Sequence, residues 1–356
     1  MLNIEKISIE EVHIEKTPKL NEIVKIMKDY GGIADAYSLL PSKPYHTVSF
    51  QLNNTYSAFA NALRRILVEE IIVSSMTTDE NDILTDDEFI SGLKKVLLKN
   101  LALTPINQES KLLESGCDIH LYVKNTTNDI IDVFASDIKI TSNKKEVSND
   151  LIIYPNIVIM RLRPGKYLNL RKIVIQTGRA YEHYGYFSLL NSTMYRPLDI
   201  IPYDQFTKKG EKSMEVDCSK FELGFTTCGN IMPKTVINKM IDKFEYDLLD
   251  IKTKITTYLK SDTGDYYSGD GCEVERVDEI YNYKFPGHYI SVTAAIAMRC
   301  YKLDETIPFC TSRVDRFDSM IGFIRIKHAD PNKLVLAAID ACLADLETIG
   351  DAFKKA

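Results

Sequence analysis

The sequence has no pair of cysteines spaced as C-x-x-C, although it contains seven cysteines. Such pairs supply ligands to many structural zinc sites, and an even number of cysteines is typical of a secreted disulfide framework. An odd number without that spacing indicates reduced thiols that fill core positions. We therefore expect an intracellular protein.

Long apolar runs are missing as well. The longest uncharged stretches, such as residues 151–160, are far shorter than the roughly 20 residues that a transmembrane helix requires. The first residues, MLNIEKISIEEVHIEK, carry too many charges for a secretory signal peptide. These absences predict a soluble chain without a membrane partner.

A basic excess is also lacking, because 44 Lys and Arg stand against 50 Asp and Glu, which gives a net charge of −6. Proteins that bind nucleic acid by themselves usually carry a strongly basic surface. The charge balance therefore argues against a chain whose own function is to hold DNA or RNA.

No catalytic motif is present: the sequence contains no Walker loop, no G-x-S-x-G and no H-E-x-x-H. Its six histidines are scattered. His183 follows Glu182 and could be proposed as a general base, but a structural histidine is the stronger interpretation. His288 is expected to hydrogen-bond the start of a helix. We expect no catalytic residue in this chain.

The most informative stretch is residues 46–71, HTVSFQLNNTYSAFANALRRILVEEI. Its first part alternates apolar and polar residues, as a half-buried strand does. Residues 53–55 are suited to accept hydrogen bonds from the first amides of a helix. The arginine pair and the glutamate pair that follow are expected largely off the apolar stripe of that helix. The stripe includes Phe59, Leu63, Ile66 and Leu67.

This stretch resembles the assembly helix of the α-like subunits of multisubunit DNA-directed RNA polymerases. In that family a similar N-A-L-R-R-I-L core precedes a Glu-Glu-Ile-Pro-like ending, and Ile72 stands here in place of the proline. The resemblance implies a helix that packs against a second α-like unit and docks the second-largest polymerase subunit. The docking residues that it implies are Asn61, Arg64, Arg65 and Glu69.

Further passages resemble the family in the same order. Residues 86–106, DDEFISGLKKVLLKNLALTPI, are expected to form an amphipathic helix and are similar to the family's D-E-F-I-A-H-R-L-G-L-I-P-I passage. Residues 132–140, 161–168 and 177–188 are similar to segments of the family's inserted β-rich domain. The strand FELGFTTCG at residues 221–229, with a long helix at 234–259, resembles the return to the assembly domain.

One departure from the family concerns zinc. Eukaryotic-type members often carry four cysteines just after the passage that corresponds to residues 86–106, but only Cys117 lies in that region here. One thiol cannot complete a tetrahedral site, so no zinc is expected. By the resemblance, the catalytic magnesium belongs to the large subunits, and this chain is expected to hold no cofactor.

The C-terminal part follows a stretch rich in Gly, Asp and Ser at residues 261–272, which predicts a linker. Residues 273–285 are expected to form a strand, 290–301 a helix, 307–327 a hairpin and the residues from Pro331 onward a last helix. This order loosely resembles the small, eleventh-type partner of the polymerase α-like pair.

The resemblance therefore implies an α+β fold in which two α-like assembly domains, normally separate chains, are fused. A joined pair of this kind resembles polymerases of large cytoplasmic DNA viruses, which implies a location in the host cytoplasm or the virion. The expected division is an extension at 1–42, a third-subunit-like domain at 43–76 and 215–260, an inserted β-rich domain at 77–214, the linker at 261–272 and an eleventh-subunit-like domain at 273–356. Besides the first helix, the residues expected to pack the assembly helices are Val236, Met240, Phe244, Leu248, Leu334, Ala338, Cys342 and Leu346.

The implied partners are the second-largest and largest polymerase subunits and other small subunits, with DNA and RNA reached only through the assembled complex. Two alternatives remain open from the residues. A stand-alone enzyme or adaptor that shares the fold would show a deep polar pocket. A nucleic-acid-binding transcription factor would show a salt-sensitive affinity for DNA.

Overall fold

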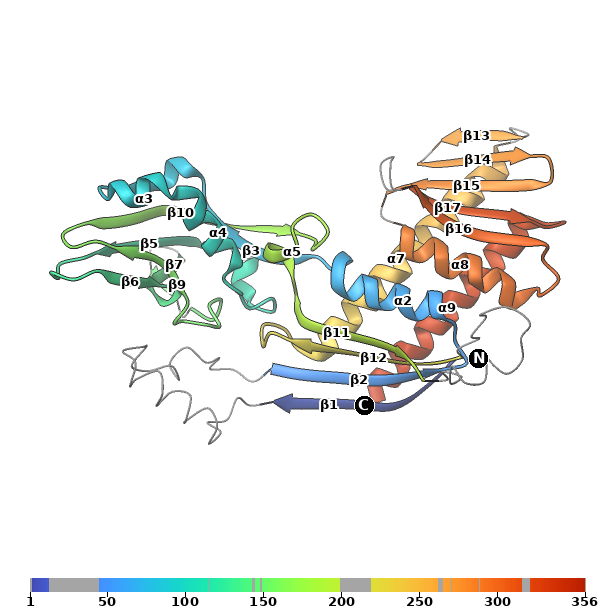
Figure 1. The fold of residues 1–356 in the computed structure, drawn as a ribbon, viewed down its shortest axis with the longest axis horizontal. Helices are drawn as coiled ribbons and strands as arrows, with labels where there is room; N and C mark the ends of the chain where they lie inside the picture. Colours follow the sequence, from blue (N-terminus) through green and yellow to red (C-terminus); the bar gives the residue numbers. More distant parts are fainter. Residues whose placement is uncertain are drawn as a thin grey trace, which may run out of the picture.

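The computed structural model describes residues 2–12, 45–114, 116–142, 145–147, 149–198, 219–261, 265–269, 271–287, 289–315 and 321–355. It shows an α+β protein in which two antiparallel sheets lie on either side of a layer of helices, and a third, sheet-rich body extends from one end (Figure 1). Two hydrophobic cores correspond to these parts. One includes the sheets and helices of the layered body, and the other lies within residues 76–173.

The first sheet is entirely antiparallel, and its strands lie in the order β1 (Asn3–Val12), β2 (Tyr45–Asn53), β12 (Lys220–Thr227) and β11 (Leu190–Pro197). The expected alternation in β2 is confirmed, because Val48, Phe50 and Leu52 are fully buried. The predicted extension begins with β1 and therefore adds a strand to this sheet. The rest of that extension, residues 13–42, lies outside the described residues.

Helix α2 (Ser57–Arg65) continues into a π-helical turn, η2 (Ile66–Glu70). The expected cap at residues 53–55 is wrong. Tyr56 is the N-cap, without a side-chain hydrogen bond, and Asn54 instead turns the chain with a left-handed φ of 57°. Glu70 was expected off the apolar stripe, but it is only 3% exposed.

Helix α7 (Pro233–Lys260) is confirmed where a long helix was expected.

The C-terminal part forms the second sheet and two helices. The strands lie in the order β13 (Tyr266–Gly269), β14 (Cys272–Val277), β15 (Ile280–Pro286), β17 (Ile321–Lys327) and β16 (Phe309–Asp315), and the helices are α8 (Ile290–Leu303) and α9 (Pro331–Lys355).

Two expectations for this part are corrected. The predicted linker at 261–272 contains β13, which pairs with β14 and so belongs to the sheet. The single strand expected at 273–285 is a hairpin, because the chain reverses at Asp278 with a left-handed φ of 56°.

The two halves of the layered body repeat one topology. In the first half the strand order is β1-β2-β12-β11, with α2 following β2 and α7 following β12. In the second half the order is β14-β15-β17-β16, with α8 following β15 and α9 following β17. Each element of the first half thus has an equivalent in the second.

Burial follows the same repeat along the helices. When α7 and α9 are aligned on their first residues, both prolines, eight of the nine buried residues of each helix fall on buried residues of the other. The coinciding pairs include Ile237 with Val335, Asp247 with Asp345, Leu248 with Leu346 and Ile251 with Ile349.

Equivalent helices also meet each other: α2 packs on α8, and α7 packs on α9. The long helices in addition reach the sheet of the opposite half. Phe353 of α9 packs edge-on against Phe50 of β2, at 5.1 Å between ring centroids, and Tyr258 of α7 packs against Tyr267 of β13 at 5.5 Å. The two halves therefore share one core and cannot be separated without exposing it.

The inserted body contains the second core. Its strands are β3 (Val73–Thr77), β4 (Ile83–Thr85), β5 (Asp118–Lys124), β6 (Ile131–Phe134), β7 (Ile138–Ser142), β8 (Lys145–Glu146), β9 (Val158–Leu162) and β10 (Tyr167–Gly178), and its helices are α3 (Glu88–Gly92), α4 (Lys94–Leu103) and α5 (Tyr184–Phe187). Strand β10 pairs with β3, β4 and β5, while β6 and β9 form a separate pair.

The expected boundary of the insert at residue 214 is corrected, because β11 pairs with β12 in the first sheet and Leu190 lies in the first core. The helix expected at 86–106 is broken into α3 and α4. The break follows Gly92, a poor helix former, and Leu93 has non-helical backbone angles. Phe89 and Val96, which one continuous amphipathic helix would place on its apolar face, are 56% and 43% exposed.

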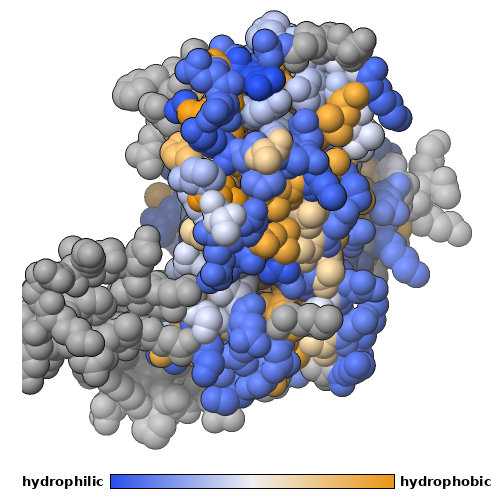
Figure 2. Space-filling view, turned by 90° about the vertical axis from the view of Figure 1, so that its right-hand side faces the viewer, coloured by the Kyte–Doolittle hydropathy of each residue, from blue (hydrophilic) through white to orange (hydrophobic). Residues whose placement is uncertain are grey.

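Among the described residues, no helix is long and apolar enough to cross a membrane. The end of the molecule opposite the insert has a mixed surface: apolar residues gather in the middle of this face, with polar residues above and below (Figure 2). The layered body is therefore not uniformly polar on its outside.

Candidate assembly surface

The four residues implied for docking lie together on the outer side of α2 and η2. Arg64 donates through Nε to Oδ1 of Asn61 at 2.9 Å, and Arg65 pairs with Oε2 of Glu69 at 3.1 Å. All four are partly exposed. Pairs of this kind along one helix contribute only a few tenths of a kcal/mol to its stability. Their effect is to hold two guanidinium groups in fixed orientations at the surface.

A groove of about 430 Å³ adjoins this face. Asn61 and Arg65 line it from α2, Tyr195 from β11, and Ser291 and Ala294 from α8. The groove therefore lies where the first half meets the second, and a partner that fills it would contact both halves.

The opposite side of α2 is buried. The structure places the first helix's predicted packing residues in the shared core, where Phe59 packs against Phe244 at 5.5 Å between ring centroids. Leu334 is partly buried against this core, and the other predicted packing residues are buried within it: Phe59, Leu63, Ile66, Leu67, Val236, Met240, Phe244, Leu248, Ala338, Cys342 and Leu346.

Sequence reasoning missed a buried polar cluster behind the docking face. Ser291 of α8 donates to Oε1 of Glu70 at 3.3 Å, and Nζ of Lys243 lies 3.6 Å from Oε2 of Glu70. The same ammonium group lies 2.6 Å from both carboxylate oxygens of Asp247. Burial raises the pKa of Glu70 to about 7, and Lys243 opposes this rise only in part. The cluster joins η2, α7 and α8 across the two halves.

Tyr56 forms a second connection between the halves. Its hydroxyl donates to the backbone carbonyl of Ala295 in α8 at 3.0 Å and lies 3.4 Å from Sγ of Cys342 in α9. Burial raises the pKa of Tyr56 well above its ordinary value and that of Cys342 to about 12. Both groups therefore stay neutral and act as packing and hydrogen-bonding partners.

Two ion pairs extend this network. Arg299 of α8 lies 3.3 Å from Asp345 of α9, and burial raises the pKa of that carboxyl. At the other end of the layer, Lys254 of α7 donates to Asp250 at 2.6 Å and to the hydroxyl of Tyr289 at 3.0 Å. Tyr289 is the N-cap of α8, so α7 is connected to the start of a helix in the other half.

The histidine expected to be structural has a structural role. Nδ1 of His183 accepts from the backbone amide of Tyr186 and caps the short helix α5, and the two rings stack at 3.5 Å between centroids. The expectation for His288 lies outside the described residues. Within the described ranges, no three His, Cys, Asp or Glu side chains are placed to hold a metal ion. The expectation that this chain holds no zinc stays a prediction.

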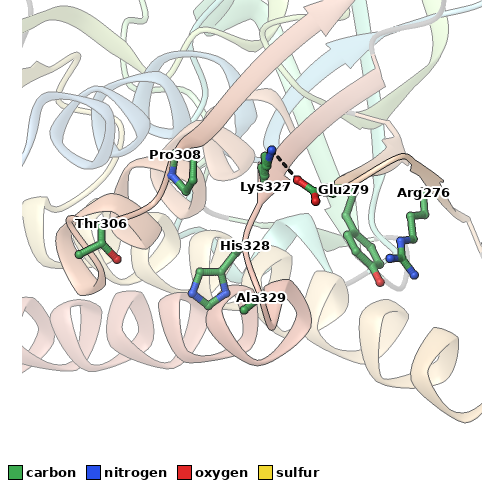
Figure 3. A pocket seen from close by; sticks show the side chains of 8 residues that line it. Arg276, Glu279, Thr306, Pro308, Lys327, His328 and Ala329 are labelled. Carbon is green, nitrogen blue, oxygen red and sulfur yellow. Dashed lines mark ion pairs between the residues drawn. The ribbon is translucent and has the colours of Figure 1, made fainter.

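A cavity of about 500 Å³ lies at one end of the second sheet (Figure 3). Its charged side chains are already paired: Lys327 lies 2.5 Å from Glu279, and Nε2 of His328 lies 3.1 Å from Asp304. In Figure 3, Lys327 is directed toward Glu279, while His328 and Thr306 lie on the other side of the cavity.

Part of the missed cluster had a signal in the sequence. Glu70 follows Ile66 by four residues and Leu63 by seven, so helical periodicity places it on the apolar face, where a charge needs a partner. Lys243 and Asp247 are spaced by four on the helix that provides that partner.

No model of a known protein family matches this sequence.

Proposed function

We propose that this chain is a non-catalytic subunit of a DNA-directed RNA polymerase, in which a fused pair of α-like domains forms the platform that docks the second-largest and then the largest subunit. The sequence motif in α2 suggests the family. The geometry of the layered body supports the role.

The observation that carries the proposal is the internal repeat. Two units with the same strand order meet through equivalent helices, α2 with α8 and α7 with α9. This is the arrangement of a two-fold symmetric dimer, in which the same patch on each subunit meets its copy. A fused α-like pair would have this arrangement within a single chain.

The placement of the motif gives further support. Its apolar residues are used inside the shared core, whereas Asn61, Arg64, Arg65 and Glu69 remain at the surface beside a groove. A helix that only completed the fold would have no need of two arginines held in fixed orientations. The division fits one face for pairing and another for docking.

The two equivalent faces differ in chemistry, which gives the platform a direction in which a partner can dock. When α2 and α8 are aligned on their N-cap residues, both tyrosines, Ala294 takes the position of Asn61 and Met298 that of Arg65. Met298 is 37% exposed. Lys302 takes the position of Glu69. The face on α8 therefore lacks the arginine pair of α2, and since both faces line the same groove, a partner docked there can distinguish the two halves.

Fusion also changes how the pair forms. Because the two halves belong to one chain, they meet at an effective concentration that reaches millimolar for short linkers. The platform is then complete before any other subunit binds. In this proposal the chain reaches DNA and RNA only through the complex, the large subunits hold the catalytic magnesium, and the complex works in a host cytoplasm or a virion.

The test is purification of the tagged full chain from its native source, followed by identification of proteins that are recovered stoichiometrically. Recovery of two very large polymerase subunits without a separate eleventh-type partner is the expected result. A separate small partner would keep the polymerase role but remove the fusion. Recovery of the chain alone would contradict the proposal and favour a stand-alone adaptor.

A further inference from the structure

A second groove lies between the two long helices, α7 and α9. Its residues are distant in sequence from the docking residues on α2. It is a cavity of about 640 Å³ bounded by α7 and α9. Ile241, Leu343 and Leu346 provide its apolar lining. Gly350 borders the groove without a side chain, and a Cβ there would lie 3.6 Å from Cδ1 of Ile241. The two helices thus leave room for one or two apolar side chains of a partner.

The rim of this groove is acidic. Asp242 and Glu245 stand on the α7 side and Glu347 on the α9 side, and the described residues provide none of the three with an ion pair. Two further charged residues on the rim, Asp340 and Lys354, already have ion-pair partners. Like charges gathered beside an apolar groove repel one another, and this cost is recovered when positive charges arrive with a partner.

The apolar surface continues beyond the groove along α7. Tyr246 and Leu249 are 66% and 43% exposed, and both are unusually large for isolated surface positions. An adjoining cavity of about 360 Å³ shares Asp242. It is lined by Ile71 and Ile72 together with three basic side chains, those of Arg179, Lys239 and Lys243. The surface therefore runs from the C-terminal part of α9 across α7 to the end of η2.

We propose that this groove between α7 and α9 docks an amphipathic helix of another protein. Leucine-like side chains, spaced by three or four residues, would enter between Ile241 and Leu343, and flanking Lys or Arg side chains would pair with Asp242, Glu245 and Glu347. This is recognition of a helix in a groove. The same acidic rim disfavours nucleic acid, whose phosphates it would repel.

The proposed partner is distinct from the subunits that would dock on α2, so the inference does not require the polymerase assignment. A photo-crosslinking residue at Leu343 tests the groove, and one at Asn61 tests the α2 face in parallel. Each full-length variant is expressed in the native source and irradiated in the intact assembly, and the crosslinked peptide is sequenced. The Asn61 product reports the proposed function, and the Leu343 product reports this inference.

The expected product at Leu343 is a peptide of a different protein that carries at least two Lys or Arg residues around apolar residues at helical spacing. The double variant Glu245→Lys and Glu347→Lys should lower its yield at least tenfold. A matched variant, Glu114→Lys and Glu305→Lys, changes the charge equally at exposed positions away from the groove and should leave the yield unchanged.

Several results would overturn the inference. They are a crosslink to residues 13–44 of the same chain, a crosslink to a second copy, a product without basic residues, and the absence of any product at Leu343. An equal loss of yield in both charge variants would also contradict it, because the effect would then come from net charge alone.

Discussion

Arg64 and Arg65 are held by partners on their own helix, and this separates their effect on docking from their effect on folding. We expect Arg64→Ala with Arg65→Ala to weaken the proposed docking of the second-largest subunit by about 3 kcal/mol, because truncating one partner of a charge pair that is buried in an interface typically costs 2–5 kcal/mol. Unfolding of the chain should change little, since pairs within a helix stabilise weakly. The measurement is recovery of the large subunits with the tagged variant.

The matched control is Arg161→Ala with Arg171→Ala, which removes two exposed, paired arginines from the inserted body. Normal recovery with the control and loss with the α2 variant would support the docking face. Normal assembly of the α2 variant would refute it.

Glu70 gives a prediction about pH. Its pKa is about 7 in the folded chain and 4.5 for the ordinary side chain, so the folded state binds the proton more tightly. This contribution to stability is fully present below about pH 4.5 and is lost as the pH rises through 7. Replacement by neutral glutamine removes that loss. Glu70→Gln should therefore be more stable than the unaltered chain at pH 8, by up to about 3 kcal/mol, and nearly equal at pH 4.5.

Denaturant unfolding at both pH values measures this difference. Glu69→Gln, one residue earlier and partly exposed, is the control and should show little change between the two values. A stability difference for Glu70→Gln that is the same at pH 4.5 and pH 8 would show that the buried carboxyl is not responsible.

At the scale of elements, helix α9 of the second half packs against the sheet of the first half. Phe353, 6% exposed, packs on Phe50 of β2. Phe353→Ala should destabilise the chain by about 3 kcal/mol, within the usual cost of removing a buried phenyl ring. Hydrogen exchange should rise in β2 and in α9 together, because the contact joins them.

The control for this change is Phe89→Ala, since Phe89 is 56% exposed and its removal should cost less than about 0.5 kcal/mol. Faster exchange confined to the last turn of α9, with β2 unaffected, would contradict the proposed support.

The elements that could be predicted from sequence are those whose pattern is local. Helix α7 repeats apolar residues at steps of four, from Val236 and Met240 to Phe244 and Leu248. This spacing places them on one face of an α-helix, and that face is buried. Strand β11 could not be assigned in this way. Its sequence, LNSTMYRP, does not alternate apolar and polar residues, and its place is set by pairing with β12, a partner distant in sequence.

The candidate site divides similarly. The outer face of α2 could be predicted because the arginine pair is part of the N-A-L-R-R-I-L motif itself. The cluster of Glu70, Lys243 and Ser291 could not be assembled, because its members come from three helices whose packing the sequence does not state. The hairpin turn at Asp278 also escaped prediction, since it lacks the glycine that usually marks a left-handed position.

For the whole molecule, the shared core predicts that the halves depend on each other. Residues 1–261 and 265–356, produced as separate chains, should each be poorly folded alone and should form a one-to-one complex when produced together. Separating them would expose Phe50, Phe244 and their neighbours to water. Size-exclusion chromatography and circular dichroism check both statements, with the unbroken chain as reference. Two fragments that fold independently would contradict the shared core.

The chain leaves the layered body and returns to it along neighbouring strands. Strand β3 pairs with β10 from Thr77 opposite Val174 to Val73 opposite Gly178, and the amide of Tyr181 donates to the carbonyl of Glu69. The entry and exit points of the insert are therefore adjacent. Such a module can be lengthened, exchanged or replaced by a tight turn at little entropic cost to its host. The insert can therefore be altered without changing the helices that pair in the layered body.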